Sequence, residues 1–358
     1  MANQNIRKPR FYVDLLNHLM ARGIAQNTNF DVADTGGSGV TATRGIQTGV
    51  EAQLFDMRPS TLVSFDTSGD RDSQVLITID TQGDYAKNFI AILNHNMASA
   101  SAKVRISRSG TKSHMQTVNF ADGDRMAPTE IVNTDDAGNA SDDSSSVVKP
   151  ATDGSTLFTF GEVTDRYIGI QFEGIESETS LITTDGLFNA SNDLTIGCIL
   201  IGEYFDMPVS PDLAVTRSII FDSTKQHQSL GGQTYSTMIN HGRNVSSTSK
   251  APFSLPNLNR SVYGGRLAFD MNFSYLASTD LMPDEYHTHD TTDDAVIEDV
   301  WNRTNGNHIP FIFSVDNTST GDNAESEHIF ARFDQNKIEM KQVALDTFNV
   351  SLKIKEEF

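Results

Sequence analysis

The chain has few of the residues that would cross-link a fold or anchor it in a membrane. Its 358 residues include a single cysteine, Cys198, which excludes an intrachain disulfide. Cys198 lies in the apolar run 194–201 and is expected to be a small buried side chain. No run approaches the ~18 apolar residues of a membrane span, and the N-terminal sequence MANQNIRKPRF lacks an apolar signal region. We therefore expect synthesis in a reducing compartment, without signal-peptide export or membrane insertion.

Basic and aromatic residues are also scarce. The chain has 27 Lys and Arg against 47 Asp and Glu, which gives a formal net charge of −20. A field of that sign repels phosphate backbones and anionic membranes, and so it argues against sequence-specific nucleic-acid binding. Aromatic residues make up 8% of the chain, although glycan binding usually needs exposed aromatic side chains. Tyr85 and Tyr167 are the candidates for exposed aromatics.

The residue types that are abundant in this chain favour turns. The hydrophobic fraction is 37%, and Asp, Asn, Ser, Thr and Gly fill the difference. This composition predicts short strands and long loops. The length fits two domains, each able to bury its own core.

The N-terminal residues 1–50 predict a short helix and an extended arm. Within 11–22, Leu15, Leu16 and Leu19 have helical spacing, and Gly23 suits a helix end. Residues 24–50 show no sustained period and are expected to be loop or weak edge strand.

Residues 51–206 predict an antiparallel β-sandwich. The segments QVLITID, AKVRIS and RYIGIQFE alternate apolar and polar residues, as half-buried strands do. In AKVRIS the exposed positions would be Lys103, Arg105 and Ser107. The continuous apolar runs FIAILNHN and LTIGCILIGEYF are typical of central strands. Residues 121–155, rich in Asp, Ser and Asn, are expected to form a long acidic loop.

Two prolines within 206–213 place a domain boundary before a second sandwich at 207–358. Strands are expected at RLAFDMNFSYL and at the C-terminal FNVSLKIKEEF. The segment TTDDAVIEDVWNRTNG predicts the one helix of this domain, with Trp301 on its apolar face. The fold class is therefore mainly β, with two antiparallel β-sandwich domains, a short N-terminal helix and one C-terminal helix.

Motifs for chemistry are weak. Asp34-Thr35-Gly36 matches the aspartic-protease tripeptide, but it occurs once, in a Gly-rich loop, and an ordinary turn is the better interpretation. His287 and His289 are better explained as part of an exposed acidic loop than as metal ligands. No nucleophile elbow, P-loop, HExxH or CxxC motif occurs, so we expect no enzyme activity, no catalytic residues and no cofactor. A structural calcium ion has weak candidate ligands in Asp66, Asp70 and Asp72.

Two stretches resemble virion proteins of tailed bacteriophages. Ile92-Leu93-Asn94-His95-Asn96-Met97 resembles a strand end in a galactose-binding-like, discoidin-type sandwich, and His95 and Asn96 there are expected to satisfy nearby backbone groups. The segments 309–316, 331–334 and 349–357 resemble the C-terminal part of distal-tail or tail-tip baseplate proteins. Together the two cover about half of the chain. In this chain the sugar-binding-like sandwich comes first, which departs from the common form of that family.

The resemblance implies a structural virion protein at the phage tail tip, made in the host cytoplasm. It implies a ring of copies, with six favoured, that connects the tail tube to host-facing parts. The C-terminal strand is expected to supply the ring contact through Phe348, Val350, Leu352 and Ile354 and a free strand edge. The alternative is a receptor-binding, glycan-binding or capsid-decorating virion protein. A glycan hydrolase would need paired carboxylates in a cleft, which so acidic a sequence leaves open.

Overall fold

The computed structural model forms two compact units, each described by itself below. Unit 1 comprises Met1–Phe11, Asp206–Asn317 and Ser326–Phe358, and unit 2 comprises Tyr12–Phe205 and Thr318–Glu325. No helix in the described part of the chain is long and apolar enough to cross a membrane. The described residues are 7–36, 38–39, 42–116, 120–133, 146–175, 186–221, 225–237, 253, 266–282, 295–319 and 327–357.

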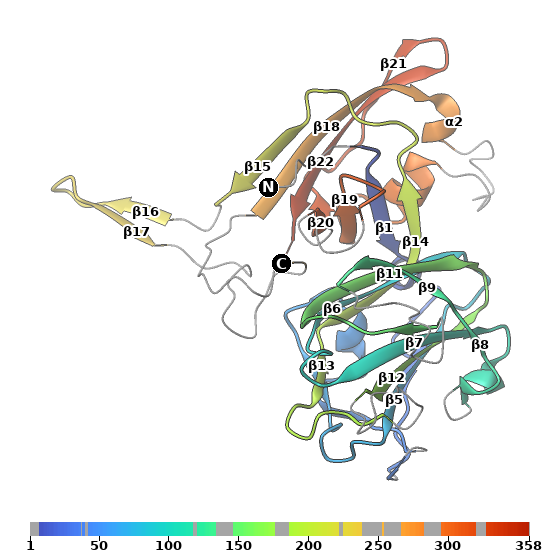
Figure 1. Cartoon of the computed structure of the whole chain (residues 1–358). Coiled ribbons are helices and arrows are strands. Elements are labelled where there is room, and N and C mark those ends of the chain that lie inside the picture. Colours follow the sequence, from blue (N-terminus) through green and yellow to red (C-terminus); the bar gives the residue numbers. More distant parts are fainter. Residues whose placement is uncertain are drawn as a thin grey trace. The chain divides into compact units, whose positions relative to one another are not determined.

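Unit 2 is a sandwich of antiparallel sheets (Figure 1). In its first sheet the order is β10-β7-β12-β5-β2, with β8 beside β7. The second sheet has the order β1-β14-β6-β11-β9, and a small third sheet has the order β13-β4-β3. The strands are β1 (Arg10–Asp14), β2 (Phe30–Val32), β3 (Ile46–Thr48), β4 (Val63–Phe65), β5 (Gln74–Asp80), β6 (Lys87–His95), β7 (Ala102–Ser109), β8 (Asp124–Arg125), β9 (Pro128–Val132), β10 (Val147–Val148), β11 (Gly154–Val163), β12 (Tyr167–Gly174), β13 (Leu194–Ile196) and β14 (Cys198–Asp206).

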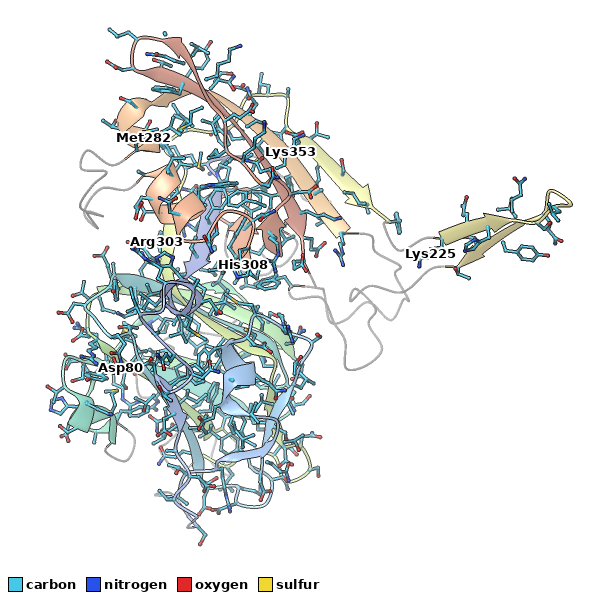
Figure 2. The ribbon with its side chains drawn as sticks, turned by 180° about the vertical axis from the view of Figure 1, so that it is seen from behind. Asp80, Lys225, Met282, Arg303, His308 and Lys353 are labelled. Atoms are coloured by element: carbon cyan, nitrogen blue, oxygen red, sulfur yellow. The ribbon has the colours of Figure 1, made fainter. Side chains whose placement is uncertain are left out.

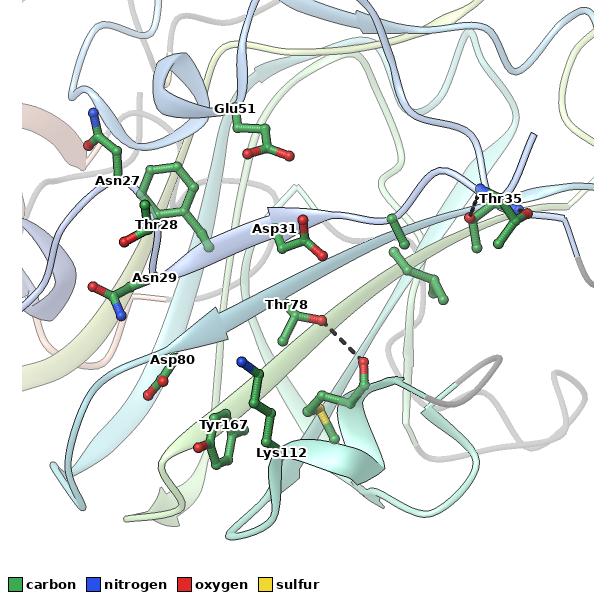
Figure 3. A pocket seen from close by; sticks show the side chains of 15 residues that line it. Asn27, Thr28, Asn29, Asp31, Thr35, Glu51, Thr78, Asp80, Lys112 and Tyr167 are labelled. Carbon is green, nitrogen blue, oxygen red and sulfur yellow. Dashed lines mark hydrogen bonds between the residues drawn. The ribbon is translucent and has the colours of Figure 1, made fainter.

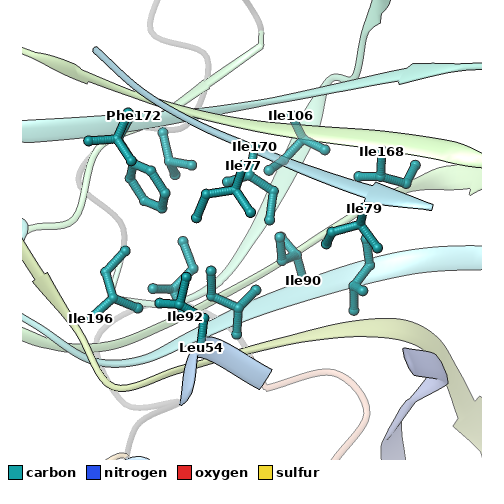
Figure 4. Close-up of a cluster of buried hydrophobic side chains, with 14 of the residues drawn as sticks. Leu54, Ile77, Ile79, Ile90, Ile92, Ile106, Ile168, Ile170, Phe172 and Ile196 are labelled. Atoms are coloured by element: carbon teal, nitrogen blue, oxygen red, sulfur yellow. The ribbon is translucent and has the colours of Figure 1, made fainter. Parts of the chain in front are cut away.

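The core of unit 2 fills the space between the sheets. Ile77 and Ile170 come from the first sheet and Ile90 and Ile92 from the second, and all four are fully buried (Figure 4). Burial of apolar area of this kind is the main stabilising term of a fold. The predicted central strand at 89–96 is confirmed, because β6 is buried along both faces apart from Asn94. Cys198 is buried as expected, and burial raises the pKa of its thiol.

The prediction that AKVRIS is only half-buried is wrong. Lys103 and Ser107 are fully buried and Arg105 is nearly so. The charged side chains of β7 meet Glu173 of β12, with Lys103 Nζ 3.4 Å and Arg105 Nε 3.6 Å from Glu173 Oε2. Alternation identified the core face of this strand but could not reveal that ion pairs cover the opposite face.

The prediction of one long loop at 121–155 is also wrong for the described residues of that range. Strands β8, β9 and β10 form there and β11 begins there. Ile131, Val132, Val147 and Val148 are buried. These few apolar residues anchor short strands on the sheet edges, where little hydrophobic area is needed. The most acidic part, 134–145, lies outside the described residues.

The N-terminal helix begins later than the sequence predicted. Helix α1 spans Leu15–Ala21, and 10–14 form strand β1 instead. Asp14 caps α1 by accepting a hydrogen bond from the Asn17 amide at 2.7 Å. Leu15, Leu16 and Leu19 are buried as their spacing predicted. Gly23 follows the helix with a φ of 71°, a left-handed conformation that favours glycine. Two 3₁₀-helices follow in unit 2, η1 (Glu51–Phe55) and η2 (Lys112–Gln116).

The strands of unit 1 follow the antiparallel order β15-β18-β22-β20-β19, and β21 also pairs with β22. A separate hairpin is formed by β16 and β17. The described elements of the unit are β15 (Thr216–Ile220), β16 (Lys225–Gln228), β17 (Thr234–Thr237), β18 (Arg266–Ala277), α2 (Ser278–Leu281), η5 (Val296–Asn302), β19 (Phe311–Ser314), β20 (His328–Phe333), β21 (Met340–Ala344) and β22 (Thr347–Glu356).

The C-terminal strand does not provide the free edge that the sequence analysis assigned to it. β22 pairs with β18 on one side and with β20 and β21 on the other. Val350, Leu352 and Ile354 are fully buried in unit 1, and Phe348 is half-buried. The alternating pattern predicted a buried face, but pairing partners cannot be read from one strand's sequence.

The helix expected around Trp301 is present as η5, a π-helical turn, and its predicted N-terminal residues lie outside the described ones. Trp301 packs on Phe333 with ring centroids 5.1 Å apart. The short helix α2 was not predicted. The fold class, mainly β with antiparallel sandwich-like sheets and few helices, is confirmed.

Candidate functional site

A cleft of ≈620 Å³ lies on the outer face of the first sheet of unit 2 (Figure 3). Its floor comes from three neighbouring strands. Asp31 of β2 lies opposite Thr78 of β5, and Asp80 of β5 lies opposite Tyr167 of β12. Residues opposite one another in a sheet project from the same face, so strand register alone gathers these side chains.

The two walls come from the segment before β2 and from the 3₁₀-helices. Asn27, Thr28 and Asn29 form one wall with Glu51 of η1. Glu51 is held in place because its Oε1 accepts a hydrogen bond from the Val32 amide at 3.0 Å. Lys112 of η2 extends over the floor from the other wall (Figure 3).

A small hydrophobic cluster fixes η2 above the sheet. Leu76, Met115, Phe120 and Tyr167 are buried together there. Gly169 makes room for it, since a Cβ on Gly169 would lie 2.6 Å from the Phe120 ring. Thr78 Oγ1 also donates to the Met115 carbonyl at 3.3 Å. The position of Lys112 therefore depends on packing beneath it.

Asp80 is kept ionised at one end of the cleft. Burial alone would raise the pKa of its carboxyl, but hydrogen bonds from Arg166 and Gln82 and the charges of Arg166 and Lys112 together lower that pKa. Arg166 donates to both carboxylate oxygens, at 2.6 and 2.9 Å. This bidentate pair neutralises Asp80.

The cleft retains acceptors and donors that face solvent. Within the described part of the chain, no hydrogen bond or ion pair involves the side chains of Asp31, Asn27 or Thr28. Lys112 is exposed and interacts with Asp80 through charge alone. A carboxylate, an ammonium, an amide and a hydroxyl thus line one open cleft. This set can hydrogen-bond a ligand that carries many neutral hydroxyl groups.

His95 and Asn96 lie at the end of β6, away from this cleft. His95 is buried, and its Nδ1 accepts from the Met97 amide at 3.2 Å while Nε2 lies 2.7 Å from Thr156 Oγ1. That pattern requires the proton on Nε2, and burial lowers the pKa of His95 to about 3. The Asn96 side chain donates to the Asp193 carbonyl and accepts from the Thr195 amide, both at 2.7 Å. Both side chains thus hold the strand end.

Asp66, Asp70 and Asp72 do not form a metal site in the described structure. No group of three or more potential ligands occurs among the described residues. Asp70 is buried and lies 2.9 Å from Arg44 Nη2, so a cation there would displace a guanidinium. A hydrogen bond to Asp70 raises the pKa of Asp72, as expected of two carboxyl groups sharing a proton.

The remaining sequence candidates lie outside the cleft or outside the described residues. Asp34 accepts from the Gly36 amide at 3.0 Å, which is an ordinary turn. His287 and His289 lie outside the described residues. Tyr167, a candidate for an exposed aromatic, is buried and presents little ring area to the cleft, and Tyr85 is half-buried.

Sequence reasoning missed the cleft because its residues are far apart in the chain. The one local feature of the sequence that could have indicated the cleft is the polar run 26–29, directly before the buried Phe30.

The structure was compared with known proteins. No family model matches the chain, and no curated protein matches it. Similar solved structures are carbohydrate-binding modules. Chitosan-binding module 1 of the chitosanase/glucanase from Paenibacillus sp. IK-5 is 12% identical, with a TM-score of 0.30, and the match covers 53% of this chain and 98% of the module. The module CpGH89CBM32-5 from Clostridium perfringens, in complex with GalNAc-β-1,3-galactose, is 10% identical, with a TM-score of 0.29 and coverage of 49% and 97%. CBM32 of AlyQ, in complex with 4,5-unsaturated mannuronic acid, is 18% identical, with a TM-score of 0.25 and coverage of 46% and 95%.

At these TM-scores the ligand of this chain has to be judged from its own cleft. The tail-tip role remains a prediction from sequence.

Proposed function

We propose that this chain is a non-catalytic glycan-binding protein whose ligand occupies the cleft of unit 2. The observation that carries the proposal is the pairing of a solvent-facing acceptor, Asp31, with a solvent-facing donor, Lys112, across an open cleft of ≈620 Å³. Ligand clefts of small molecules span roughly 300–1,000 Å³. Adjacent hydroxyls of a sugar ring act as donor and acceptor at once, so they suit such a pair.

The charges of the cleft favour a neutral glycan over a strongly anionic one. Asp31 and Glu51 add two negative charges and Lys112 one positive charge, while Asp80 is neutralised by Arg166. The whole chain at −20 adds repulsion for polyanions. The small aromatic area favours binding by hydrogen bonds over binding by ring stacking.

The cleft lacks the arrangement of a glycosidase among its described residues. Such an enzyme uses two carboxyl groups across the scissile bond, one of them protonated. Asp80 is ion-paired and Glu51 is hydrogen-bonded to the main chain, which leaves Asp31 as the carboxylate free to act. We therefore propose binding without turnover.

The setting we propose is the particle of a tailed bacteriophage, where the chain would bind host surface glycans as a receptor-binding or decorating protein. The support is the sequence resemblance around His95 and Asn96 and at 309–316, 331–334 and 349–357. Detection of the chain by mass spectrometry in purified virions would support this location, and its absence from them would refute it.

The binding proposal is tested with a glycan array followed by calorimetry on the best ligand. Asp31→Ala and Lys112→Ala should each weaken affinity about tenfold, the equivalent of about 1.4 kcal/mol. The matched control is Glu162→Ala, which removes an exposed strand carboxylate of unit 2 outside the cleft. Equal affinity for all three variants, or no glycan bound by the wild-type chain, would contradict the proposal.

A second candidate function is that of a structural assembly subunit, with the tail-tip ring as its specific form. Nine of the eleven exposed large hydrophobic side chains of the described residues belong to unit 1, which is the smaller unit. Exposed apolar side chains can contribute to an association surface. A particle reconstruction that shows this chain in isolated copies would exclude a ring.

A further inference from the structure

A buried amine, a buried carboxylate and a buried carboxamide lie together on the outer face of the first sheet of unit 2. Lys103 of β7 and Gln171 of β12 are 0% exposed, and Glu173 of β12 is 7% exposed. Lys103 lies opposite Glu173 in the paired strands, and Gln171 is two residues from Glu173 on the same face. Lys103 and Gln171 are therefore diagonal neighbours, about 7–8 Å apart along the backbone, a separation that long side chains can span.

Glu173 connects the amine with the carboxamide. Its Oε2 lies 3.4 Å from Lys103 Nζ, and its Oε1 accepts a hydrogen bond from Gln171 Nε2. Within the described part of the chain, the buried Oε2 accepts no hydrogen bond. A carboxylate between two nitrogen atoms can take a proton from one and pass a proton to the other. Glu173 is thus placed to move a proton from Lys103 to Gln171.

The carboxamide of Gln171 is oriented and polarised by its other partners. Arg125 Nη1 of β8 donates to Gln171 Oε1 at 2.7 Å. Gln74 Oε1 of β5 accepts from Gln171 Nε2 at 2.9 Å. Attack of a nucleophile on a carboxamide carbon places negative charge on the oxygen, and a cation already fixed there stabilises that charge. The Arg125 guanidinium occupies this position.

The surroundings of Lys103 favour the neutral amine, which is the nucleophilic form. Burial disfavours the charged form of an amine. Arg105 Nε lies 3.6 Å from the same oxygen of Glu173 and competes for its charge. An arginine keeps its proton inside a protein, whereas a lysine can lose one. Lys103 is therefore the member of this cation pair that can act as a nucleophile.

We infer that Lys103 and Gln171 form an intramolecular amide bond, with Glu173 as the proton shuttle and Arg125 as the stabiliser of the oxyanion. Lys103 Nζ attacks Gln171 Cδ and forms the new C–N bond. Glu173 carries a proton from Nζ to Nε2, and the C–Nε2 bond breaks to release ammonia. An amine and a carboxamide thus become a secondary amide and ammonia, so no oxidant, reductant or cofactor is needed.

The bond would give the chain a covalent link that its composition otherwise lacks. It joins β7 to β12, in a chain whose single cysteine excludes an intrachain disulfide. The reaction takes place once in each chain. It goes beyond glycan binding and does not depend on it.

The inference is tested by the intact mass and the tryptic peptide map of the purified full chain. The chain should be lighter by one ammonia than the mass calculated from its sequence. Trypsin does not cleave after an acylated lysine, so the map should contain a branched peptide that joins residues 88–105 to residues 167–217. The map is decisive because an asparagine that cyclises to a succinimide also loses one ammonia. A wild-type chain of unmodified mass, or Lys103 and Gln171 in separate linear peptides, would overturn the inference.

Variants of the full chain separate the roles of the side chains. Lys103→Met removes the amine and should abolish the branched peptide. Glu173→Gln keeps the amine and the carboxamide, and the branched peptide should form about a hundredfold more slowly after cell-free synthesis because the proton shuttle is lost. Lys353→Met, which changes an exposed lysine of β22 (Figure 2), is the matched control and should form the branched peptide at the wild-type rate.

Circular dichroism of each variant shows whether the fold is kept. A folded Glu173→Gln chain that forms the branched peptide at the wild-type rate would overturn the role of Glu173. The test on the wild-type chain needs no variant, so it decides the existence of the bond even where Lys103→Met or Glu173→Gln fails to fold.

Discussion

His95 is a buried titratable side chain whose contribution to the stability of the fold depends on pH. Burial lowers its pKa in the folded state to about 3, while an unfolded chain has a value near 6.5. Between these values the unfolded chain binds a proton at this position and the folded chain does not. The contribution of neutral His95 is therefore complete above pH 6.5 and is lost as the pH falls toward 3.

The pH dependence can be isolated with His95→Gln, which cannot titrate. The unfolding free energy of the wild type minus that of the variant should rise with pH between 3 and 6.5, by up to about 1.4 kcal/mol per pH unit, and level off above. Denaturant unfolding at several pH values measures it. Thr156→Val removes the partner of Nε2 without removing the titration and should cost the same at each pH. A pH-independent difference for His95→Gln would show that folding does not change the pKa of His95.

Asp14 has the opposite dependence. Burial raises the pKa of its carboxyl to about 6, even though hydrogen bonds from Asn17 and Ile201 lower it. Its stabilising contribution is complete below pH 3.8 and is lost as the pH rises through 6. Between these values His95 and Asp14 offset one another, so the stability of the wild type should depend less steeply on pH than that of His95→Gln.

At the scale of elements, the cleft depends on how η2 is held over the first sheet. Gly169→Ala places a methyl group where the Phe120 ring lies, at 2.6 Å. The ring must move, and with it the cluster that supports Met115 and Lys112. We expect a loss of about 1–3 kcal/mol of stability and a roughly tenfold loss of glycan affinity.

The control for this variant lies on the second sheet of the same unit. Gly161 of β11 has no atom within 4 Å of its ideal Cβ, so Gly161→Ala should change neither the stability of the chain nor its glycan affinity. Thermal unfolding and calorimetry of both variants provide the comparison. If a stably folded Gly169→Ala chain kept wild-type glycan affinity, glycan binding would not depend on the position of η2.

The elements also show what sequence alone could predict. Leu15, Leu16 and Leu19 indicated a helix, and the runs around Ile77, Ile92 and Ile170 indicated buried strands, because periodicity reports the side that faces the core. Periodicity does not report what covers the other side. Lys103 therefore looked exposed, although Glu173, seventy residues on, buries it.

The cleft could not be predicted for the same reason. Asp31, Thr78, Lys112 and Tyr167 are dispersed over more than a hundred residues and meet through strand register and a packed 3₁₀-helix. The assembly edge was assigned to the C-terminal strand because a long final strand with an exposed edge can pair with another chain. In the described part of the chain β22 has strand neighbours on both sides, which one strand's sequence cannot reveal.

At the scale of the whole molecule, the two units carry separate proposed roles. The cleft and its supports lie in unit 2, and most of the exposed large hydrophobic side chains of the described residues lie in unit 1. Sites without shared partners usually act independently. Asp31→Ala should therefore leave any self-association unchanged. Val343→Lys, which changes an exposed side chain of unit 1, should leave glycan affinity unchanged.

The central claim, that unit 2 binds a glycan in this cleft, is tested most directly by a crystal structure of the full chain soaked with the tightest ligand from the array. The account predicts sugar density over the face of β2, β5 and β12, with ring hydroxyls within hydrogen-bond distance, about 2.7–3.2 Å, of Asp31 and Lys112. Density for the sugar elsewhere on the chain, with this cleft filled by water alone, would contradict it.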